Sequence, residues 1–330
     1  MLQKVSVYNN IQLFIILLST VFVGSSAGAY EFSQDKTHTS NPAKIHAVHN
    51  HKFKHHSGYL LKHVPFKILK KKSRTAVTLQ VFDCGEIQVN DLSLFNPALI
   101  GQSKLLKNAC YYIEHPKKGG LIWDTGFNDS LADAVEPQVV FGGAIEATMP
   151  SKLSTQLQHA NIDPSKISYM AISHLHFDHT GNMPLFSQAQ WLIQKPEWAL
   201  AFSEQAAAAS FNPDNYSHIN KSRTKLLKGH YDVFDDGSVI ILSAPGHTVG
   251  HQMLYVKLKN TGPVLLSGDL YHFMENRENY GIPVFNDSKK DTVSSFAFID
   301  KLVDKTGAKL WIQHDADQFA DIKLSPFIYD

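Results

Sequence analysis

Four side chains that can bind a metal ion lie within six consecutive positions of this sequence. His174, His176, Asp178 and His179 follow the spacing H-x-H-x-D-H. Imidazole nitrogens and carboxylate oxygens are the ligands that zinc and similar divalent ions accept. A single histidine more often fills a polar gap in a core. Packing alone does not account for four metal-binding side chains within six positions. The motif therefore predicts a metal site.

Three further candidate ligands, His247, Asp269 and His314, each come shortly after an apolar run that is typical of a β-strand. Because a compact sheet brings successive strand ends to one edge, the loops that follow these strands can converge on one site. Taken singly, each residue also has an interpretation as a polar core residue. Taken together with the first motif, they predict a centre that holds two divalent metal ions.

The elements that must position these residues alternate along the chain after residue 75. Thr78 and Gln80 alternate with apolar neighbours, as in a half-buried strand. We expect strands at 77–81, 121–123, 167–172, 238–242, 264–266 and 309–312, and helices at 151–160, 196–209 and 291–306. This interleaved order, without an internal repeat, predicts one α/β domain over residues 75–330. The segment 131–150 is long enough to form a loop over a substrate.

The composition argues against a nucleic-acid-binding protein. The chain has 330 residues, of which 43% are hydrophobic, and its formal net charge is +1. Such a chain can bury a sizeable core, and its balanced charge gives no electrostatic footprint for nucleic acid.

The first 29 residues have the pattern of a secretory signal peptide. Lys4 precedes an apolar stretch at 11–24, and small residues follow it, so we expect cleavage near Ala29. An uncleaved membrane anchor is the alternative, but the apolar stretch is shorter than the ~20 residues that a spanning helix needs. The mature protein is therefore expected to be exported, either to the periplasm or into the medium.

Residues 30–74 are a histidine- and lysine-rich N-terminal arm, for which a flexible, solvated extension is the expectation. The alternatives are metal collection by its histidines and contact of the basic run at 70–74 with an anionic membrane. The two cysteines, Cys84 and Cys110, either pair in an oxidising compartment or remain core thiols. Neither lies near the histidine motif in the sequence, so neither is a candidate nucleophile.

The candidate ligands together resemble the pattern of the metallo-β-lactamase superfamily, in which H-x-H-x-D-H is followed by single histidine, aspartate and histidine ligands. The resemblance covers residues 75–330 and implies an α/β fold, the αβ/βα four-layer sandwich. It also implies an allocation of the ligands: one metal ion on His174, His176 and His247, the other on Asp178, His179 and His314, and Asp269 bridging both.

Within the superfamily the chain is most similar to the exported N-acyl-homoserine lactonases, which destroy quorum-sensing signals. The similarity rests on the segments 82–85, 123–126, 174–181, 245–251, 268–273 and 311–315. It implies a hydrolase that opens a lactone ring by attack of a hydroxide shared between two metal ions, with zinc as the expected ion. Many lactonases have a tyrosine three residues after the bridging aspartate, whereas this chain has His272. The histidine keeps a hydrogen-bond donor and leaves the substrate preference open.

The lactonase resemblance gives two residues expected catalytic roles. Asp178 passes a proton to the departing alkoxide, and His272 donates a hydrogen bond to the oxyanion. Asp124 is expected to accept a hydrogen bond from a ligand histidine, with a turn-capping aspartate as the alternative. His251 is either a similar support or an ordinary strand residue. Candidates for the acyl-chain pocket are Phe141, Met149 and Phe202, or the aromatic residues around Phe273, with packing within a lid as the alternative.

Other functions remain open from the sequence. The main alternative is a promiscuous phosphotriesterase or another esterase of the same superfamily, and a periplasmic metal-binding protein is a further one. A bridging carboxylate argues against simple metal storage, and Asp269 at the bridging position disfavours a β-lactamase with a cysteine ligand. The expected partner is a small-molecule lactone, and both a monomer and a homodimer fit the sequence.

Overall fold

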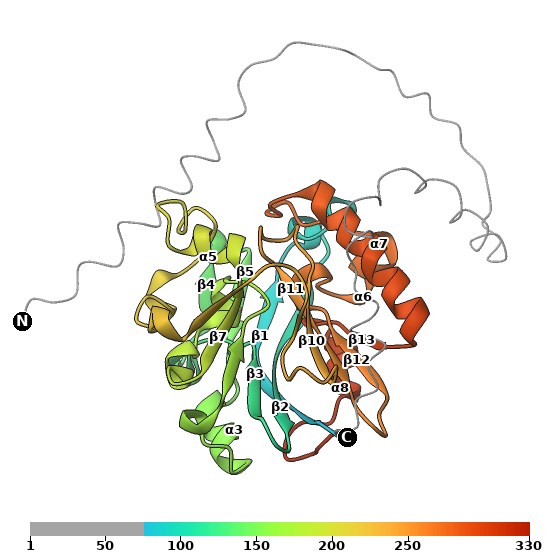
Figure 1. Cartoon of the computed structure of the whole chain (residues 1–330). Helices are drawn as coiled ribbons and strands as arrows, with labels where there is room; N and C mark the ends of the chain where they lie inside the picture. Colours follow the sequence, from blue (N-terminus) through green and yellow to red (C-terminus); the bar gives the residue numbers. More distant parts are fainter. Residues whose placement is uncertain (1–75) are drawn as a thin grey trace, which may run out of the picture. The chain divides into compact units, whose positions relative to one another are not determined.

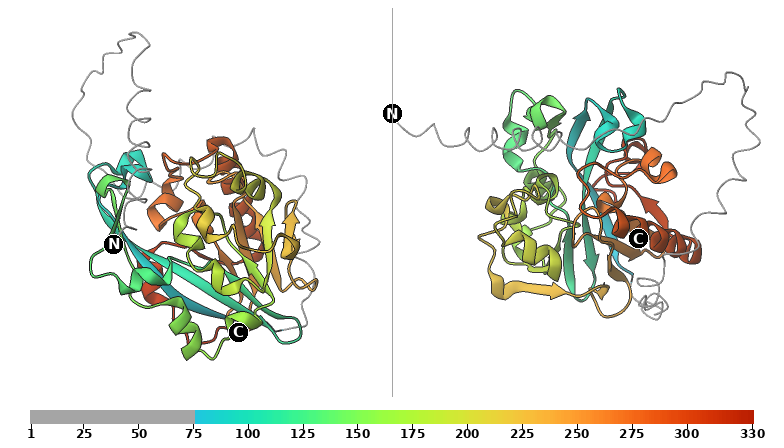
Figure 2. Two further views of the ribbon diagram at one scale, coloured as in Figure 1. Left: turned by 90° about the vertical axis from the view of Figure 1, so that its left-hand side faces the viewer. Right: turned by 90° about the horizontal axis from the view of Figure 1, so that it is seen from above.

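Two β-sheets pack face to face, and helices cover their outer faces, in the computed structural model, which describes residues 76–330 (Figures 1 and 2). The predicted αβ/βα four-layer sandwich is confirmed. The expected signal peptide at 1–29 and the arm at 30–74 lie outside the described residues. Within the described part of the chain, no helix is both long and apolar enough to cross a membrane.

The larger sheet has eight strands and the smaller sheet has five. The order in the larger sheet is β4 (Gln138–Val140), β5 (Ile145–Thr148), β1 (Thr78–Val89), β2 (Lys104–His115), β3 (Gly119–Trp123), β6 (Tyr169–Ala171), β7 (Gln190–Gln194) and β8 (Thr224–Leu227). The order in the smaller sheet is β13 (Lys309–Trp311), β12 (Pro263–Leu266), β11 (Gln252–Lys257), β10 (Val239–Ser243) and β9 (Tyr231–Asp232). The α-helices are α3 (Leu153–His159), α4 (Phe177–Thr180), α5 (Lys195–Ala201), α6 (Met274–Asn279), α7 (Lys289–Thr306) and α8 (Ala316–Asp321).

Alternation along β1 shows how the sequence forms these layers. Leu79 and Val81 are fully buried in the core between the two sheets. Phe82 and Cys84 belong to the core between the larger sheet and its helices. Because side chains on a strand alternate between its two faces, a strand that is buried on both faces needs apolar residues at odd and even positions. The smaller sheet uses the same pattern to pack against α7.

Strand direction explains why the candidate ligands meet at one edge. In the larger sheet, β3 and β6 are parallel neighbours, so Asp124 and the histidine motif leave the sheet at the same end. In the smaller sheet, β12 and β13 are parallel, and Asp269 and His314 follow their ends. The loop with His247 follows β10, which is antiparallel to β11 and therefore runs in the same direction as β12. The carboxyl ends of these strands thus bring all the loops together.

Two expected elements differ from those in the structure. Helix α5 ends at Ala201, not at residue 209, because the Ser203 hydroxyl donates to the Leu200 carbonyl and accepts from the Gln205 amide. A serine that hydrogen-bonds the nearby backbone in this way competes with helix continuation. The segment 131–150 is also no continuous loop, since β4 and β5 form a hairpin that pairs with β1.

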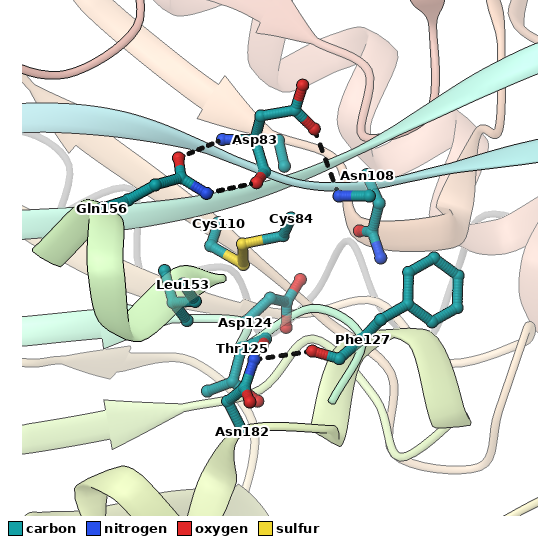
Figure 3. Close-up of a disulfide and its surroundings, with 12 residues drawn as sticks. Asp83, Cys84, Asn108, Cys110, Asp124, Thr125, Phe127, Leu153, Gln156 and Asn182 are labelled. Atoms are coloured by element: carbon teal, nitrogen blue, oxygen red, sulfur yellow. Dashed lines mark hydrogen bonds between the residues drawn. A yellow bond between two sulfur atoms is a disulfide. The ribbon is translucent and has the colours of Figure 1, made fainter. Parts of the chain in front are cut away.

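Cys84 and Cys110, whose pairing the sequence left open, form a disulfide between β1 and β2, with their Cα atoms 5.9 Å apart. Phe82 and Cys110 are opposite each other in the antiparallel register, so the two cysteines are close across neighbouring strands. Figure 3 shows the disulfide beside the loop that contains Asp124 and Thr125. The disulfide therefore links β1 to β2, and β2 in turn hydrogen-bonds to the candidate site through Lys107 and Asn108.

Replacing both cysteines by alanine is expected to lower the free energy of unfolding by about 3 kcal/mol, because the disulfide restricts the unfolded chain across a separation of 26 residues. Urea unfolding of the variant and the wild type measures this difference, and wild-type protein after reduction is the matched control. Equal stability of the oxidised wild type and the variant would contradict the expectation. Metal content should not change, because neither sulfur is a ligand.

Candidate metal centre

Three imidazole nitrogens face one another at the edge of the sheets. His174 Nε2 lies 2.8 Å from His176 Nδ1, and His247 Nε2 lies 3.1 Å from both. A neutral imidazole has one N–H, so three nitrogens that converge in a triangle do not satisfy one another by hydrogen bonds. Their lone pairs fit a shared cation instead. We call these residues the three-histidine group.

A second set of ligand atoms lies next to the first. His179 Nε2 is 3.3 Å from Asp178 Oδ2, and His314 Nε2 is 3.6 Å from the same carboxylate oxygen. All three side chains are buried, and their ligand atoms lie close enough together to hold one metal ion. We call Asp178, His179 and His314 the Asp178 group.

Asp269 joins the two groups through its two carboxylate oxygens. Its Oδ2 lies 3.4 Å from His247 Nε2 and 3.6 Å from His174 Nε2. Its Oδ1 lies 3.0 Å from His314 Nε2 and 3.3 Å from His179 Nε2. One oxygen therefore faces each group, which is the arrangement that a carboxylate shared by two cations requires. The structure thus brings together all seven predicted ligands.

In His179 and His314, the ring nitrogen that faces away from the site has a partner that fixes which nitrogen carries the proton. His314 Nδ1 donates to the Lys107 carbonyl at 2.7 Å, and His179 Nδ1 donates to Asp124 Oδ2 at 3.1 Å. Each hydrogen bond leaves the Nε2 lone pair free to bind a cation. His179 Nε2 and Asp269 Oδ1 are also buried without a hydrogen-bond partner. The donor set and these unpaired atoms therefore fit two bound cations.

Burial sets the protonation state of the three-histidine group. Burial lowers the pKa of His174 and His247 well below the usual value for imidazole, and it lowers the pKa of His176 to about 4. These rings are therefore neutral near pH 7, the form that binds metal. Burial also opposes ionisation of Asp269, but the nearby imidazoles of His314 and His179 outweigh this and hold the pKa of Asp269 well below its usual range.

The local backbone of the histidine motif depends on a close contact. Helix α4 begins at Phe177 and ends at Thr180, and Gly181 then packs against the backbone of Phe127 and Asn128. A Cβ atom at Gly181 would lie 2.1 Å from the Asn128 nitrogen. Only glycine allows this approach, which keeps α4 and its ligands beside the loop after β3.

Asp124 and His251 hold the ligand loops without belonging to either group. Asp124 accepts a hydrogen bond from the Ser173 amide at 2.6 Å in addition to that from His179, as expected for a supporting carboxylate. It has a φ of 56°, a left-handed conformation that is uncommon for a residue with a side chain. His251 donates through Nδ1 to the Ala244 carbonyl and accepts through Nε2 from the Asp269 amide. His251 is thus a support for the bridging residue.

His272 lies beside the bridging carboxylate with both ring nitrogens free. Its Nε2 is 3.2 Å from Asp269 Oδ2, its exposed fraction is 2%, and neither nitrogen has a hydrogen-bond partner. The ring is held by the edge contact with Phe95, at a centroid distance of 4.8 Å. Tyr271 instead stacks on Phe296 under α7. The histidine, and not the neighbouring tyrosine, therefore faces the site.

The sequence-based candidates for the acyl-chain pocket lie in different surroundings. Met149 and Phe273 are buried in the core, and Phe202 is 36% exposed and packs on Trp198. Their contact with an acyl chain stays a prediction. Phe141 is 57% exposed and contacts Phe177 of the histidine motif. Sequence reasoning missed Phe285, whose ring lies close to four rings of the site.

Phe285 is 44% exposed, and its ring lies between 5.3 and 6.4 Å from four rings of the site. These rings are Phe95, His176, His247 and His272. No motif marks Phe285, because it lies in an irregular loop before α7 and reaches the site only through the tertiary fold. An exposed aromatic residue over a metal centre offers an apolar contact for a bound molecule.

Comparison with known proteins agrees with this geometry. Residues 104–306 match the metallo-beta-lactamase superfamily. The N-acyl homoserine lactonase AttM of Azorhizobium caulinodans is 30% identical over 233 residues, which are 67% of this chain and 86% of AttM. The lactonase AiiA of Bacillus thuringiensis subsp. kurstaki is 29% identical over 245 residues, which are 72% of this chain and 92% of AiiA.

A solved lactonase structure is also similar to this chain. It is an N-acyl homoserine lactone hydrolase with the product N-hexanoyl-L-homoserine bound at its catalytic metal centre. It has a TM-score of 0.67 and 26% sequence identity, and the match covers 78% of this chain and 100% of that chain. This chain belongs to the metallo-β-lactamase superfamily and, within it, to the family of the N-acyl homoserine lactonases.

Proposed function

We propose that this protein hydrolyses the lactone ring of N-acyl homoserine lactones with the aid of two divalent metal ions. The observation that carries this proposal is the complete set of seven converging ligands in a chain that covers 86% of a lactonase relative at 30% identity. Zinc is the proposed ion, because imidazole and carboxylate ligands in small groups suit it. When bound, two such ions supply Lewis acidity for the substrate carbonyl and a water of lowered pKa.

Asp178 has the charge and position to move protons in this reaction. Burial favours its neutral form, but the imidazoles of His179 and His314 outweigh burial and lower the pKa of Asp178 below its usual value. Its carboxylate is therefore ionised near pH 7 and can accept a proton from water. It can then return the proton to the ring oxygen that leaves as an alcohol.

His272 has an unpaired N–H that fits a substrate oxygen. As water adds to the lactone carbonyl carbon, negative charge develops on the carbonyl oxygen, and a donor held in a buried position stabilises that charge until the ring opens. The surrounding Phe95 and Phe285 keep water away from this hydrogen bond. The exposed rings of Phe285 and Phe141 give the acyl chain an apolar surface beside the metal groups.

Replacing His272 by phenylalanine is expected to lower kcat/KM about 100-fold, because it removes the donor and keeps an aromatic ring in the same space. His272→Tyr restores a donor and is expected to recover most of that loss. Steady-state kinetics on one lactone, together with metal content, measures both effects. Normal kcat/KM in the phenylalanine variant would remove His272 from the proposed mechanism.

We also propose that the protein acts outside the cytoplasm. The buried disulfide between Cys84 and Cys110 supports this, because such bonds persist in oxidising compartments. The apolar leader at 11–24 supports it independently. Cell fractionation with N-terminal sequencing of the mature chain is the test, and a mature cytoplasmic protein that keeps residue 1 would contradict it.

Mass spectrometry of the reaction product tests the proposed chemistry. Lactone hydrolysis adds one water and gives an N-acyl homoserine, whereas cleavage of the amide would release free homoserine lactone. We expect only the ring-opened product from purified protein. Release of the fatty acid, or turnover of phosphotriesters with no lactone opening, would assign the site to another hydrolase activity.

A further inference from the structure

Glu197 is a buried carboxylate that the proposed chemistry does not use. It lies in the first turn of α5, and its exposed fraction is 1%. Burial raises the pKa of Glu197 to about 7. Removing a carboxylate from water costs free energy unless hydrogen bonds replace the lost solvation. A carboxylate in this position therefore needs an explanation beyond packing.

Three neutral donors converge on this carboxylate. Its Oε1 accepts from the Leu175 amide at 3.1 Å and from the Thr248 hydroxyl at 3.0 Å. Its Oε2 accepts from the Gly250 amide at 2.8 Å. Above about pH 7 the ionised form of Glu197 predominates. Hydrogen bonds to an ionised acceptor are stronger than those between neutral groups, so three of them then hold the attached backbone firmly.

The three donors belong to the two loops that carry the three-histidine group. Leu175 lies between His174 and His176, and Thr248 directly follows His247. One side chain of α5 is thus hydrogen-bonded to both loops, although they are more than 70 residues apart in the sequence. None of these three hydrogen bonds comes from a ligand side chain.

The fit between α5 and the second loop is close. A Cβ atom at Gly250 would lie 2.5 Å from the Glu197 Cβ and 2.7 Å from the Glu197 nitrogen. Any residue other than glycine would therefore push this loop away from the helix. The loop and the first turn of α5 are shaped to meet at this point.

We propose that Glu197 is a positioning residue that sets the spacing of the three-histidine group by holding its two loops on one carboxylate. The Asp178 group has supports of its own. Asn108 donates to the Asp178 carbonyl, His179 donates to Asp124, and His314 donates to the Lys107 carbonyl. The proposal rests on the metal centre of the proposed function but not on the lactone, so it is tested by metal binding alone.

Glu197→Gln is the sharpest variant, because it keeps the shape of the side chain. A carboxamide has only one acceptor oxygen, and whichever way it is turned, at least one backbone N–H faces its NH2 group. One loop therefore loses its anchor. Glu204→Gln makes the same chemical change on an exposed side chain of the same segment and is the matched control.

Zinc titration of metal-free protein against a competing chelator measures the affinity of each site. We expect Glu197→Gln to weaken one of the two zinc equivalents by roughly 10- to 100-fold, which is typical for loss of a group that orients metal ligands. The other equivalent should stay within about twofold of wild type, since its ligands have separate supports. The control Glu204→Gln should bind both equivalents normally.

A His314→Ala background assigns the affected site. With the Asp178 group disabled, the remaining tight equivalent belongs to the three-histidine group, and Glu197→Gln should weaken it by the same factor. Unchanged zinc affinity, or equal weakening of both equivalents, would overturn the proposal, because a merely structural role has no preference for one site.

If Glu197→Gln does not fold, Thr248→Val decides the question. This variant removes a single hydroxyl donor and places no amide in the core. Selective weakening of the same equivalent, by a smaller factor, supports the positioning role. Unchanged affinity in a folded Thr248→Val protein would overturn it.

Discussion

Asp269→Ala is expected to release both metal ions and to lower kcat/KM for lactones by much more than 100-fold. Each of its carboxylate oxygens faces one group, so its loss removes a ligand from both at once. It also removes the negative charge that offsets two cations among five buried imidazoles. Loss of a supporting group around a metal costs roughly 10- to 100-fold, and loss of a shared ligand must cost more.

Elemental analysis of the purified variant, with kinetics on the same sample, measures this effect. Asp304→Ala, which removes an exposed carboxylate from α7, is the matched control and should retain two equivalents. The metal content of His314→Ala should lie between those of the two other variants, because this variant loses one metal equivalent. It should also lose most of its activity. Two tightly bound equivalents in Asp269→Ala would show that the bridging role is wrong.

Asp178→Asn is expected to lower kcat by about 10²- to 10⁴-fold, the range that a positioned proton donor contributes. The amide keeps the shape of the side chain and can still offer an oxygen to a metal ion, but it cannot carry a proton to the leaving oxygen. Because the Asp178 backbone carbonyl accepts from Asn108 at 2.5 Å, the main chain should stay in place.

Excess metal separates the two roles of Asp178. We expect kcat to remain low when the variant is assayed with saturating zinc, because the missing group is a proton carrier. Recovery of wild-type kcat under these conditions would mean that Asp178 acts only as a ligand. Near-normal turnover with both metals bound at the outset would contradict the proton role in the same way.

The positions of the ligands follow from local patterns in the sequence. His247, Asp269 and His314 each follow a short apolar run, and the structure has β10, β12 and β13 at these runs. Strand ends are visible in a sequence because apolar runs and the turns after them are local features. The loops then converge because these strands run in the same direction and end at the same edge of the sheet.

Other parts of the site depend on contacts that no local pattern encodes. Glu197 looks like an ordinary acidic residue in the first turn of a helix, a common position for such residues. Its role is visible only when Leu175 and Gly250 are placed beside it. Phe285 is another example, since the turn before α7 determines which rings it meets.

Two further results show the same limit of local reasoning. The hairpin of β4 and β5 pairs with β1 through residues far away in the sequence, so the segment 131–150 looked like a loop. The disulfide also depends on strand register, which places Cys110 opposite Phe82. Register is set by the whole buried pattern and not by the cysteines themselves.

A pH-stat assay of the purified protein with short- and long-chain N-acyl homoserine lactones, with metal content measured on the same sample, tests the central claim most directly. The account predicts acid release by protein that holds two metal equivalents, loss of acid release on chelation, and its return when zinc is added. Two bound equivalents without opening of any lactone would contradict the proposed substrate. Lactone opening that survives complete removal of metal would contradict the metal centre itself.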